Sequence, residues 1–211
     1  MNVYKKLKGI IYLSFIPFIR FWKLISWNFY LKTHDKINLI IGSGTTKFKG
    51  WFATDIITLD VTKQEYFKKY FSLNKIDKIL AEHVLEHLSN KDLDLMIKNF
   101  YDYSSEVVNI RIAVPDGYHK DKEYIDTVKP NGTGFGADDH KHLFNYETLS
   151  AKFEKFGFVA VLKEYWDENK EFYTDYSDDE FGMIRRSFKN DKRNEDGEPH
   201  YTSLIIDFKK E

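Results

Sequence analysis

Short apolar runs alternate with amphipathic stretches from residue 36 onward, an order that predicts an α/β protein. The apolar runs predict strands at 37–41, 51–55, 76–81, 107–114, 158–165 and 202–208, with a short third strand, or a remnant of one, at 59–62. The amphipathic stretches predict helices at 63–72, 90–103 and 147–156. No helical pattern separates the last two strands, which favours an antiparallel hairpin at the edge of the sheet.

A glycine turn follows the first predicted strand. Gly42, Ser43 and Gly44 come directly after the apolar run, and Asp55 ends the next strand. Glycine lets the backbone pass close to a ligand because it has no Cβ, and a carboxylate at the end of the second strand is placed to bind a ribose diol. The pattern is typical of nucleotide sites, but an ordinary βα turn shares it.

Residues 1–34 form a basic, aromatic segment, predicted to be helical and distinct from the domain at 35–211. The segment contains no Asp or Glu and carries +6, from Lys5, Lys6, Lys8, Arg20, Lys23 and Lys32. The whole chain carries −1, so the remainder carries −7, since −1 minus +6 is −7. The apolar run stops at Arg20, too short to span a bilayer, and no small-residue cleavage site follows. Two interpretations stay open: an interfacial helix contacting a membrane through residues 3–31, and a helix packed on the domain with a kink at Pro17.

The composition favours a single folded domain and argues against several classes of partner and site. At 211 residues, with 42% hydrophobic and 17% aromatic residues, the chain is long and apolar enough for one folded domain. The net charge of −1 and the acidic remainder argue against nucleic acid as a partner. The chain has no cysteine, which excludes disulfides, thiolate metal ligands and cysteine nucleophiles. We expect a cytoplasmic protein, with peripheral contact to the inner face of the membrane if the N-terminal segment is interfacial.

Eight blocks of the sequence carry a family likeness, at residues 39–44, 50–51 with Asp55, 79–88, 111–117, 136–141, 145–149, 182–187 and 201–207. Together they resemble class I S-adenosylmethionine-dependent methyltransferases. More narrowly, they resemble a bacterial subgroup of predicted methyltransferases of undetermined substrate. The glycine turn is unspecific and the Val84-Leu85-Glu86-His87 block moderately specific, whereas the whole ordered set is strongly specific.

The resemblance implies a Rossmann-like, seven-stranded, mostly parallel sheet with an antiparallel last strand, in a three-layer αβα arrangement. It implies S-adenosylmethionine as cofactor, bound at the carboxyl ends of the strands. The residues that it assigns to cofactor binding are Gly42, Ser43 and Gly44 at the methionine and ribose, Asp55 at the ribose hydroxyls, Asp60 near the adenine, and Glu82 and His83 closing the pocket. The chain departs from the family in having Thr46 where a third glycine is common, and in lacking a helix pattern between the second and third strands.

Methyl transfer to a hydroxyl or a protonated amine also needs a proton acceptor. The long segment 117–145 is rich in Gly, Asp and His, and is too long to be a mere connector. Within it His140 is the first choice as general base, because imidazole titrates near neutrality, with Asp139 or Asp138 to orient it and His119 as the runner-up. The residues expected to bind the acceptor are Asp116, Tyr124, Tyr146, Arg185 and Arg186.

A metal site is not predicted. His83 and His87 lie four residues apart with Glu86 between them, but the order differs from His-Glu-x-x-His, and packing at the start of a helix is the favoured interpretation. Asp116, Asp138, Asp139 and His140 have side chains that suit a divalent cation, but their spacing does not show one.

The sequence therefore predicts an S-adenosylmethionine-dependent methyltransferase acting on a hydroxyl or amine of a small molecule or of a glycan or lipid-linked intermediate. One alternative is a relative that binds the cofactor without catalysis. Another is an NAD-dependent oxidoreductase, which is disfavoured because Lys47 stands where the full G-x-G-x-x-G motif needs its last glycine. The sequence does not specify the acceptor atom or the oligomeric state.

Overall fold

The computed structural model describes residues 3–56, 58–71 and 75–211, with the side chains of the first helix described from Phe15 onward. The helices are α1 (Val3–Thr33), α2 (Gln64–Phe71), α3 (Asn90–Tyr103), α4 (Lys122–Val128) and α5 (Tyr146–Glu154), with short 3-10 turns η1 (Leu85–His87), η2 (Ala137–Asp139) and η3 (Lys192–Asn194). The strands are β1 (Ile37–Ile41), β2 (Phe52–Ala53), β3 (Ile76–Glu82), β4 (Ser104–Pro115), β5 (Phe158–Trp166), β6 (Phe172–Thr174) and β7 (Ser203–Lys210).

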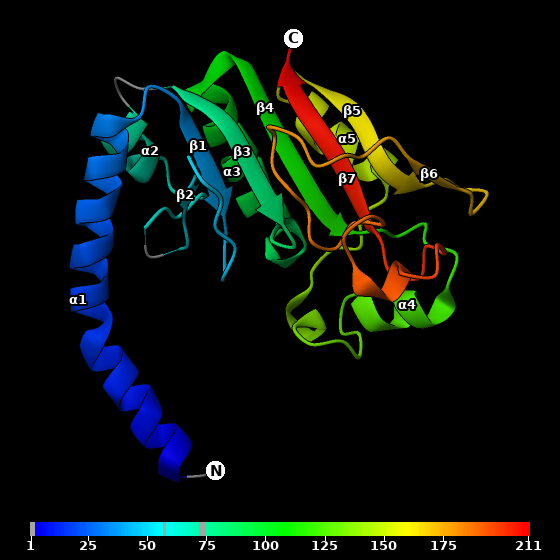
Figure 1. Ribbon diagram of the computed structural model, residues 1–211, viewed down its shortest axis with the longest axis horizontal. Helices are drawn as coiled ribbons and strands as arrows, with labels where there is room; N and C mark the ends of the chain where they lie inside the picture. Colours follow the sequence, from blue (N-terminus) through cyan, green and yellow to red (C-terminus); the bar gives the residue numbers. More distant parts are fainter. Residues whose placement is uncertain (1–2, 57, 72–74) are drawn as a thin grey trace.

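These strands form one seven-stranded sheet in the order β2-β1-β3-β4-β7-β5-β6. Strands β2, β1, β3 and β4 are parallel neighbours, and β7 pairs antiparallel with both β4 and β5 (Figure 1). Strand β5 therefore runs in the same direction as β1 to β4, and β6 pairs antiparallel with it. The predicted Rossmann-like, seven-stranded, mostly parallel sheet with an antiparallel last strand is confirmed.

Two details of the predicted sheet are wrong. Strand β7 pairs with β5 as expected, but it lies inside the sheet, where both neighbours help to bury it from Ser203 to Phe208. The predicted short strand at 59–62 is a turn, because Thr62 donates its backbone N–H and its hydroxyl to Asp60 Oδ1 at 3.1 and 2.7 Å. The seventh strand is instead β6, in the acidic segment after Trp166.

The two faces of the sheet are covered differently. Leu39, Ile41 and Ile79 point into the main core, toward helices α2, α3 and α5, of which α3 and α5 lie behind the sheet in Figure 1. Alternate residues of the same strands point to the other face and form a smaller core with Tyr176 and Ile184. This face is thus covered by the segment that leads into the 185–193 region, drawn in orange in front of the sheet (Figure 1).

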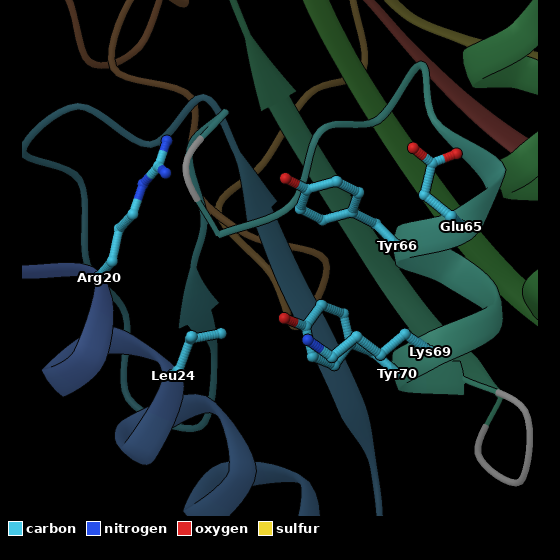
Figure 2. Close-up of a pocket in the computed structure, with 6 residues that line it drawn as sticks. All are labelled: Arg20, Leu24, Glu65, Tyr66, Lys69 and Tyr70. Atoms are coloured by element: carbon cyan, nitrogen blue, oxygen red, sulfur yellow. The ribbon is translucent and has the colours of Figure 1, made fainter. Parts of the chain in front are cut away.

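Helix α1 packs on the domain by its C-terminal half. Trp27 and Tyr30 are buried, and the Trp27 ring lies 4.6 Å from Phe52 and 5.4 Å from Tyr70 between centroids. Toward its N-terminus α1 extends away from the sheet (Figure 1). A cavity of about 380 Å³ lies between α1 and α2, as Figure 2 shows, lined by Arg20, Leu24, Glu65, Tyr66, Lys69 and Tyr70. Among the described residues, no helix combines the length and apolarity needed to cross a bilayer.

Candidate functional site

The chain turns in opposite directions from the carboxyl ends of β1 and β3. After β1 it passes to β2 on one side, and after β3 it passes to β4 on the other, so the two adjacent strands form a topological switch point. Open α/β sheets bind ligands in the crevice outside this point. A cleft of about 570 Å³ lies here, a volume typical of small-molecule sites.

The glycine turn forms one wall of this cleft. Gly42 has a φ of +58°, and a Cβ placed on it would lie 2.6 Å from Val84 Cγ2. Gly44 has a φ of +52° and open space where a Cβ would stand. The turn is fixed to β2 because Ser43 N donates to Thr54 O at 3.0 Å and Thr54 N donates to Ile40 O at 2.8 Å. Glycine is therefore needed at position 42 both for the backbone conformation and for the close approach to Val84.

Glu82 and His83 stand opposite the glycine turn, at the end of β3. Glu82 is nearly buried and lies 3.3 Å from Arg185 Nε and 3.7 Å from Arg186 Nη1. His83 has a φ of +53°, and its Nε2 lies 3.0 Å from Ser203 Oγ. Burial lowers the pKa of His83 well below its usual value, so its ring is neutral at pH 7.

Three further side chains meet deeper in the cleft. Each of Glu86, His87 and His140 offers one atom that could bind a metal ion, and these three atoms lie within 4.8 Å of one another. Among the described residues neither oxygen of Glu86 makes a hydrogen bond, although His83 Nδ1 lies 3.3 Å from Oε1, and burial raises the pKa of Glu86 to about 8. A buried carboxyl group with a perturbed pKa beside two imidazoles makes this cluster a candidate place for chemistry or for a ligand.

The loop after η2 is tied to η1 by backbone hydrogen bonds. Lys141 N and His142 N both donate to Glu86 O, at 2.7 and 3.3 Å. His140 Nδ1 lies 2.6 Å from Val128 O, and because a carbonyl only accepts, this nitrogen carries the proton. The other nitrogen, Nε2, is thereby aimed toward Glu86 Oε1, 4.0 Å away.

Three arginines line the outer part of the cleft. Arg185 and Arg186 are the two predicted from the sequence, and Arg193 is the third. Arg193 pairs with Asp191 at 2.6 Å, and its guanidinium lies 3.2 Å from the centroid of the Tyr201 ring. The guanidinium groups can bind a carboxylate or phosphate of a ligand entering the cleft.

The two acidic residues predicted at the ribose and the adenine do not line this cleft. Asp55 lies just beyond the end of β2, where Lys23 of α1 bonds its carboxylate and Thr58 N donates to it at 3.1 Å. Burial would raise the pKa of Asp55, but these bonds outweigh it and lower the pKa. Asp60 is engaged with Thr62 and lies 3.5 Å from Lys63. Both carboxylates are thus occupied within the fold.

Asp116, Tyr124 and His119 are placed in the core. Asp116 accepts from Trp166 N at 2.8 Å and from Tyr118 N at 2.9 Å, and burial raises its pKa to about 7. Tyr124 donates to Thr202 O at 2.9 Å and receives Asp116 N at 3.0 Å. The ring of His119 stacks on Tyr124 at 3.9 Å, and burial lowers its pKa to about 4. These three side chains hold β4, β5 and the start of α4 together and do not line the cleft.

Two other predicted residues have different partners from those expected. Asp139 lies 3.4 Å from His87 Nδ1, whereas the Nδ1 atom of His140 faces the Val128 carbonyl. Tyr146 is at the surface of α5, where its hydroxyl donates to Glu168 at 2.9 Å. The Asp138–Asp139 pair is exposed at the rim, so of the predicted general-base group His140 alone lines the cleft.

Three residues that were not among those predicted for the site also line the cleft, namely Glu86, His87 and Arg193. Glu86 and His87 belong to the Val-Leu-Glu-His block that carries much of the family resemblance, and their position one turn after β3 was a usable signal. Arg193 follows Arg185 and Arg186 closely in the sequence, and arginines of this kind suit a carboxylate or phosphate, but only the fold of the 185–201 segment brings it to the cleft, where its guanidinium lies 3.2 Å from the Tyr201 ring.

No protein-family model and no curated protein matches the chain. Several solved structures are similar at low identity. A SAM dependent methyltransferase from Archaeoglobus fulgidus is 15% identical, with 92% of each chain covered and a TM-score of 0.47. LepI in complex with S-adenosylhomocysteine (SAH) and a substrate analogue is 8% identical, with a TM-score of 0.47 over 89% of this chain. The present chain spans only 40% of that LepI chain.

A third solved structure is magnesium protoporphyrin IX methyltransferase from Synechocystis PCC 6803 with bound SAH. It is 8% identical, with a TM-score of 0.39 over 99% of this chain and 88% of its own. Similarities this weak assign neither an activity nor a ligand. The Rossmann-like fold is therefore established by the strand order of this chain itself.

Proposed function

We propose that this protein is an S-adenosylmethionine-dependent methyltransferase of class I. The observation that carries the proposal is the positive-φ glycine turn after β1, which lines a cleft at the switch point of the sheet together with Glu82, the last residue of β3, and His83, which follows it. The cofactor would bring an already activated methyl group, so the protein needs only to bind it, orient an acceptor and remove a proton.

We place the methionine part of the cofactor and its adenosine part in different regions of the site. The methionine end would lie against Gly42, Ser43 and Gly44, with Glu82 and His83 opposite. The adenosine end would extend along the carboxyl end of β2 toward Asp55, whose carboxylate would have to exchange its bond with Lys23 for the ribose hydroxyls. Asp60, just beyond, would then be the nearest acidic group to the adenine.

The proposed acceptor is a hydroxyl or amine of a small molecule or of a glycan or lipid-linked intermediate. Arg185 and Arg186 would bind an anionic group of this acceptor, since both line the cleft beside the carboxylate of Glu82. His140 would accept the proton, because its Nε2 atom carries a lone pair and faces the interior.

Calorimetric titration with SAH, run beside NAD, tests the proposal. We expect SAH to bind with micromolar affinity and NAD to give no heat. An Asp55→Ala variant should bind SAH at least about tenfold more weakly, a change of about 1.4 kcal/mol. The matched control is Asp102→Ala, because the Asp102 carboxylate pairs with Lys98 at 2.6 Å on the surface of α3 and does not line the cleft.

A folded protein that binds no SAH would overturn the assignment of the cofactor. Binding of NAD in place of SAH would move the chain to the oxidoreductases. Unchanged SAH binding by Asp55→Ala would leave the cofactor in place and remove Asp55 from the ribose site.

A further inference from the structure

The cluster of Glu86, His87 and His140 offers more than a single proton acceptor. It combines one carboxylate with two imidazoles, each able to give one ligating atom, and these atoms lie within 4.8 Å of one another. The side chain of Glu86 is 1% exposed, and among the described residues neither of its oxygens makes a hydrogen bond, although His83 Nδ1 lies 3.3 Å from Oε1. A bound cation would compensate this buried carboxylate.

The surroundings of the cluster orient both imidazoles as metal ligands. The Val128 carbonyl fixes the proton of His140 on Nδ1 and leaves Nε2 directed at Glu86. Asp139 lies 3.4 Å from His87 Nδ1, an arrangement that places the proton of His87 between them and frees the other ring nitrogen. A carbonyl or carboxylate behind each ligating histidine is the usual support of a metal site in proteins.

We propose that Glu86, His87 and His140 bind one divalent transition-metal ion. Two histidines and one carboxylate form a common ligand set for zinc and for non-haem iron. Tetrahedral bonds of about 2.0–2.1 Å would bring the ligand atoms to about 3.3 Å from one another, so small side-chain rotations suffice. The backbone bonds from Lys141 and His142 to Glu86 O hold the two contributing loops together before any ion arrives.

Three protein ligands would leave one position of a four-coordinate ion open toward the cleft. An acceptor hydroxyl bound there would lose its proton to solvent water more readily, because the ion lowers its pKa, and His140 would then hold the ion and not the proton. This consequence for the acceptor rests on the proposed methyl transfer, whereas metal binding itself does not.

The test uses chelator-treated full-length protein, titrated with Zn²⁺ alone by calorimetry and loaded with Co²⁺ for absorption spectroscopy. We expect one equivalent of Zn²⁺ to bind with micromolar or tighter affinity, and Co²⁺ to give the visible bands of a tetrahedral site. Glu86→Gln, His87→Ala and His140→Ala should each weaken binding at least about tenfold. His142→Ala is the matched control, because it is the nearest histidine in sequence to the cluster and lies outside it.

Absence of stoichiometric binding, or an equal loss in His142→Ala, would overturn the proposal and leave Glu86 as a buried neutral acid. The same metal-free protein is titrated with SAH, so failure of the metal site and failure of the cofactor assignment are seen separately. Circular dichroism of each variant excludes unfolding as the cause of a loss.

A second, independent observation concerns the outer face of α1. Five large apolar side chains recur at spacings of three and four residues, and so lie on one face of the helix: Phe15, Phe18, Trp22, Ile25 and Phe29. All five are exposed, Phe29 by 67%. The opposite side of the helix carries Trp27 and Tyr30, which pack on the domain, so the exposed face is not turned toward the core.

The charge of residues 1–34 indicates which kind of partner could bind the aromatic face of α1. Residues 1–34 carry six basic side chains and no acidic one, and of the six Lys23 pairs with Asp55 of the domain. Two copies of α1 packed face to face would bring only like charges together, whereas paired helices normally place opposite charges beside their apolar seam. An anionic lipid surface provides both an apolar layer for the aromatic rings and negative charge for Lys and Arg.

We infer that α1 lies on an anionic membrane surface with this aromatic face in the interface. Sedimentation with vesicles of phosphatidylglycerol and phosphatidylcholine should recover the wild-type protein, and vesicles of phosphatidylcholine alone should recover much less. The Phe18→Ser/Trp22→Ser double variant should bind at least about tenfold more weakly. Val107→Ser is the control, because Val107 is an exposed apolar side chain of β4.

Equal recovery of the double variant and the wild type, or no recovery of either, would overturn this inference. A dimer in analytical ultracentrifugation that the double variant abolishes, without vesicle binding by the wild type, would assign the face to a second copy of the chain instead.

Discussion

Arg111 is a fully buried cation, and its removal is expected to cost more stability than the loss of most surface charges. Its Nε and Nη2 atoms donate to Asp207 at 2.7 and 2.8 Å, and Nη1 donates to Asp179 and to Gly182 O, both at 2.8 Å. With a further bond from Nη2 to Asp179, every N–H of the guanidinium has an acceptor. Burial would lower the pKa of Arg111, but the bonds to the two aspartates outweigh it and raise the pKa.

Arg111→Met would leave the buried Asp207 carboxylate without a cation. Breaking a buried pair in this way costs about 3–5 kcal/mol, whereas Asp179 is partly exposed and can be solvated. Urea unfolding at pH 7, followed by tryptophan fluorescence, measures the loss. Lys98→Met is the control, because its pair with Asp102 is at the surface and is expected to contribute less than about 1 kcal/mol.

A second variant isolates the uncompensated charge as the cause. Arg111→Met combined with Asp207→Leu buries no charge at this position, so it should recover at least half of the lost stability. A loss below about 1 kcal/mol in Arg111→Met, or a double variant no more stable than the single one, would refute the reasoning.

Three further variants test other parts of the structure. Gly42→Ala should weaken SAH binding at least about tenfold, since its Cβ would meet Val84 at a positive φ, and calorimetry against wild type measures this. Trp27→Ala should cost about 3–5 kcal/mol in urea unfolding, because the ring is buried between α1, β2 and α2; a loss no larger than that of an exposed substitution would show that α1 is not docked. Burial raises the pKa of Glu164 to about 8, so its contribution to stability is full below its unfolded pKa and is lost as pH rises through the folded one. Between about pH 5 and pH 8 the wild type should therefore lose up to about 1 kcal/mol per pH unit relative to Glu164→Gln, and parallel stability curves would contradict the assignment.

The elements of the fold were largely predictable because their periodicities are local. The apolar run at 37–41 and the amphipathic pattern at 90–103 each determine their structure with little help from the rest of the chain. The place of β7 was not predictable from its own sequence, since its apolar stretch from Leu204 to Ile206 is compatible with a strand at the edge of a sheet and with one inside it. The turn at 59–62 was not predictable either, because the hydrogen bonds from Thr62 to Asp60 outweigh the strand propensity of Val61.

The site was predicted only in part for a similar reason. Gly42 and Glu82 both line the cleft: the first was predicted from the glycine turn after a buried strand, and the second was implied by the family resemblance. Asp116 follows a strand in the same way, yet it turns inward to the backbone of Trp166, a partner fifty residues away in the chain. The neighbours of a polar side chain in a long loop depend on contacts distant in sequence, so the side chains beside His140 could not be listed in advance.

The position of β7 also bears on how the chain folds as it is made. Strands β4 and β5 meet only through β7, and β7 follows both of them in the sequence. During synthesis each of the two therefore has an unpaired edge until the segment from Ser203 to Lys210 has left the ribosome. The sheet is then completed late, when β7 inserts between β4 and β5. A nascent chain stopped before Ser203 would expose the unpaired edges of β4 and β5 to other proteins in the cell.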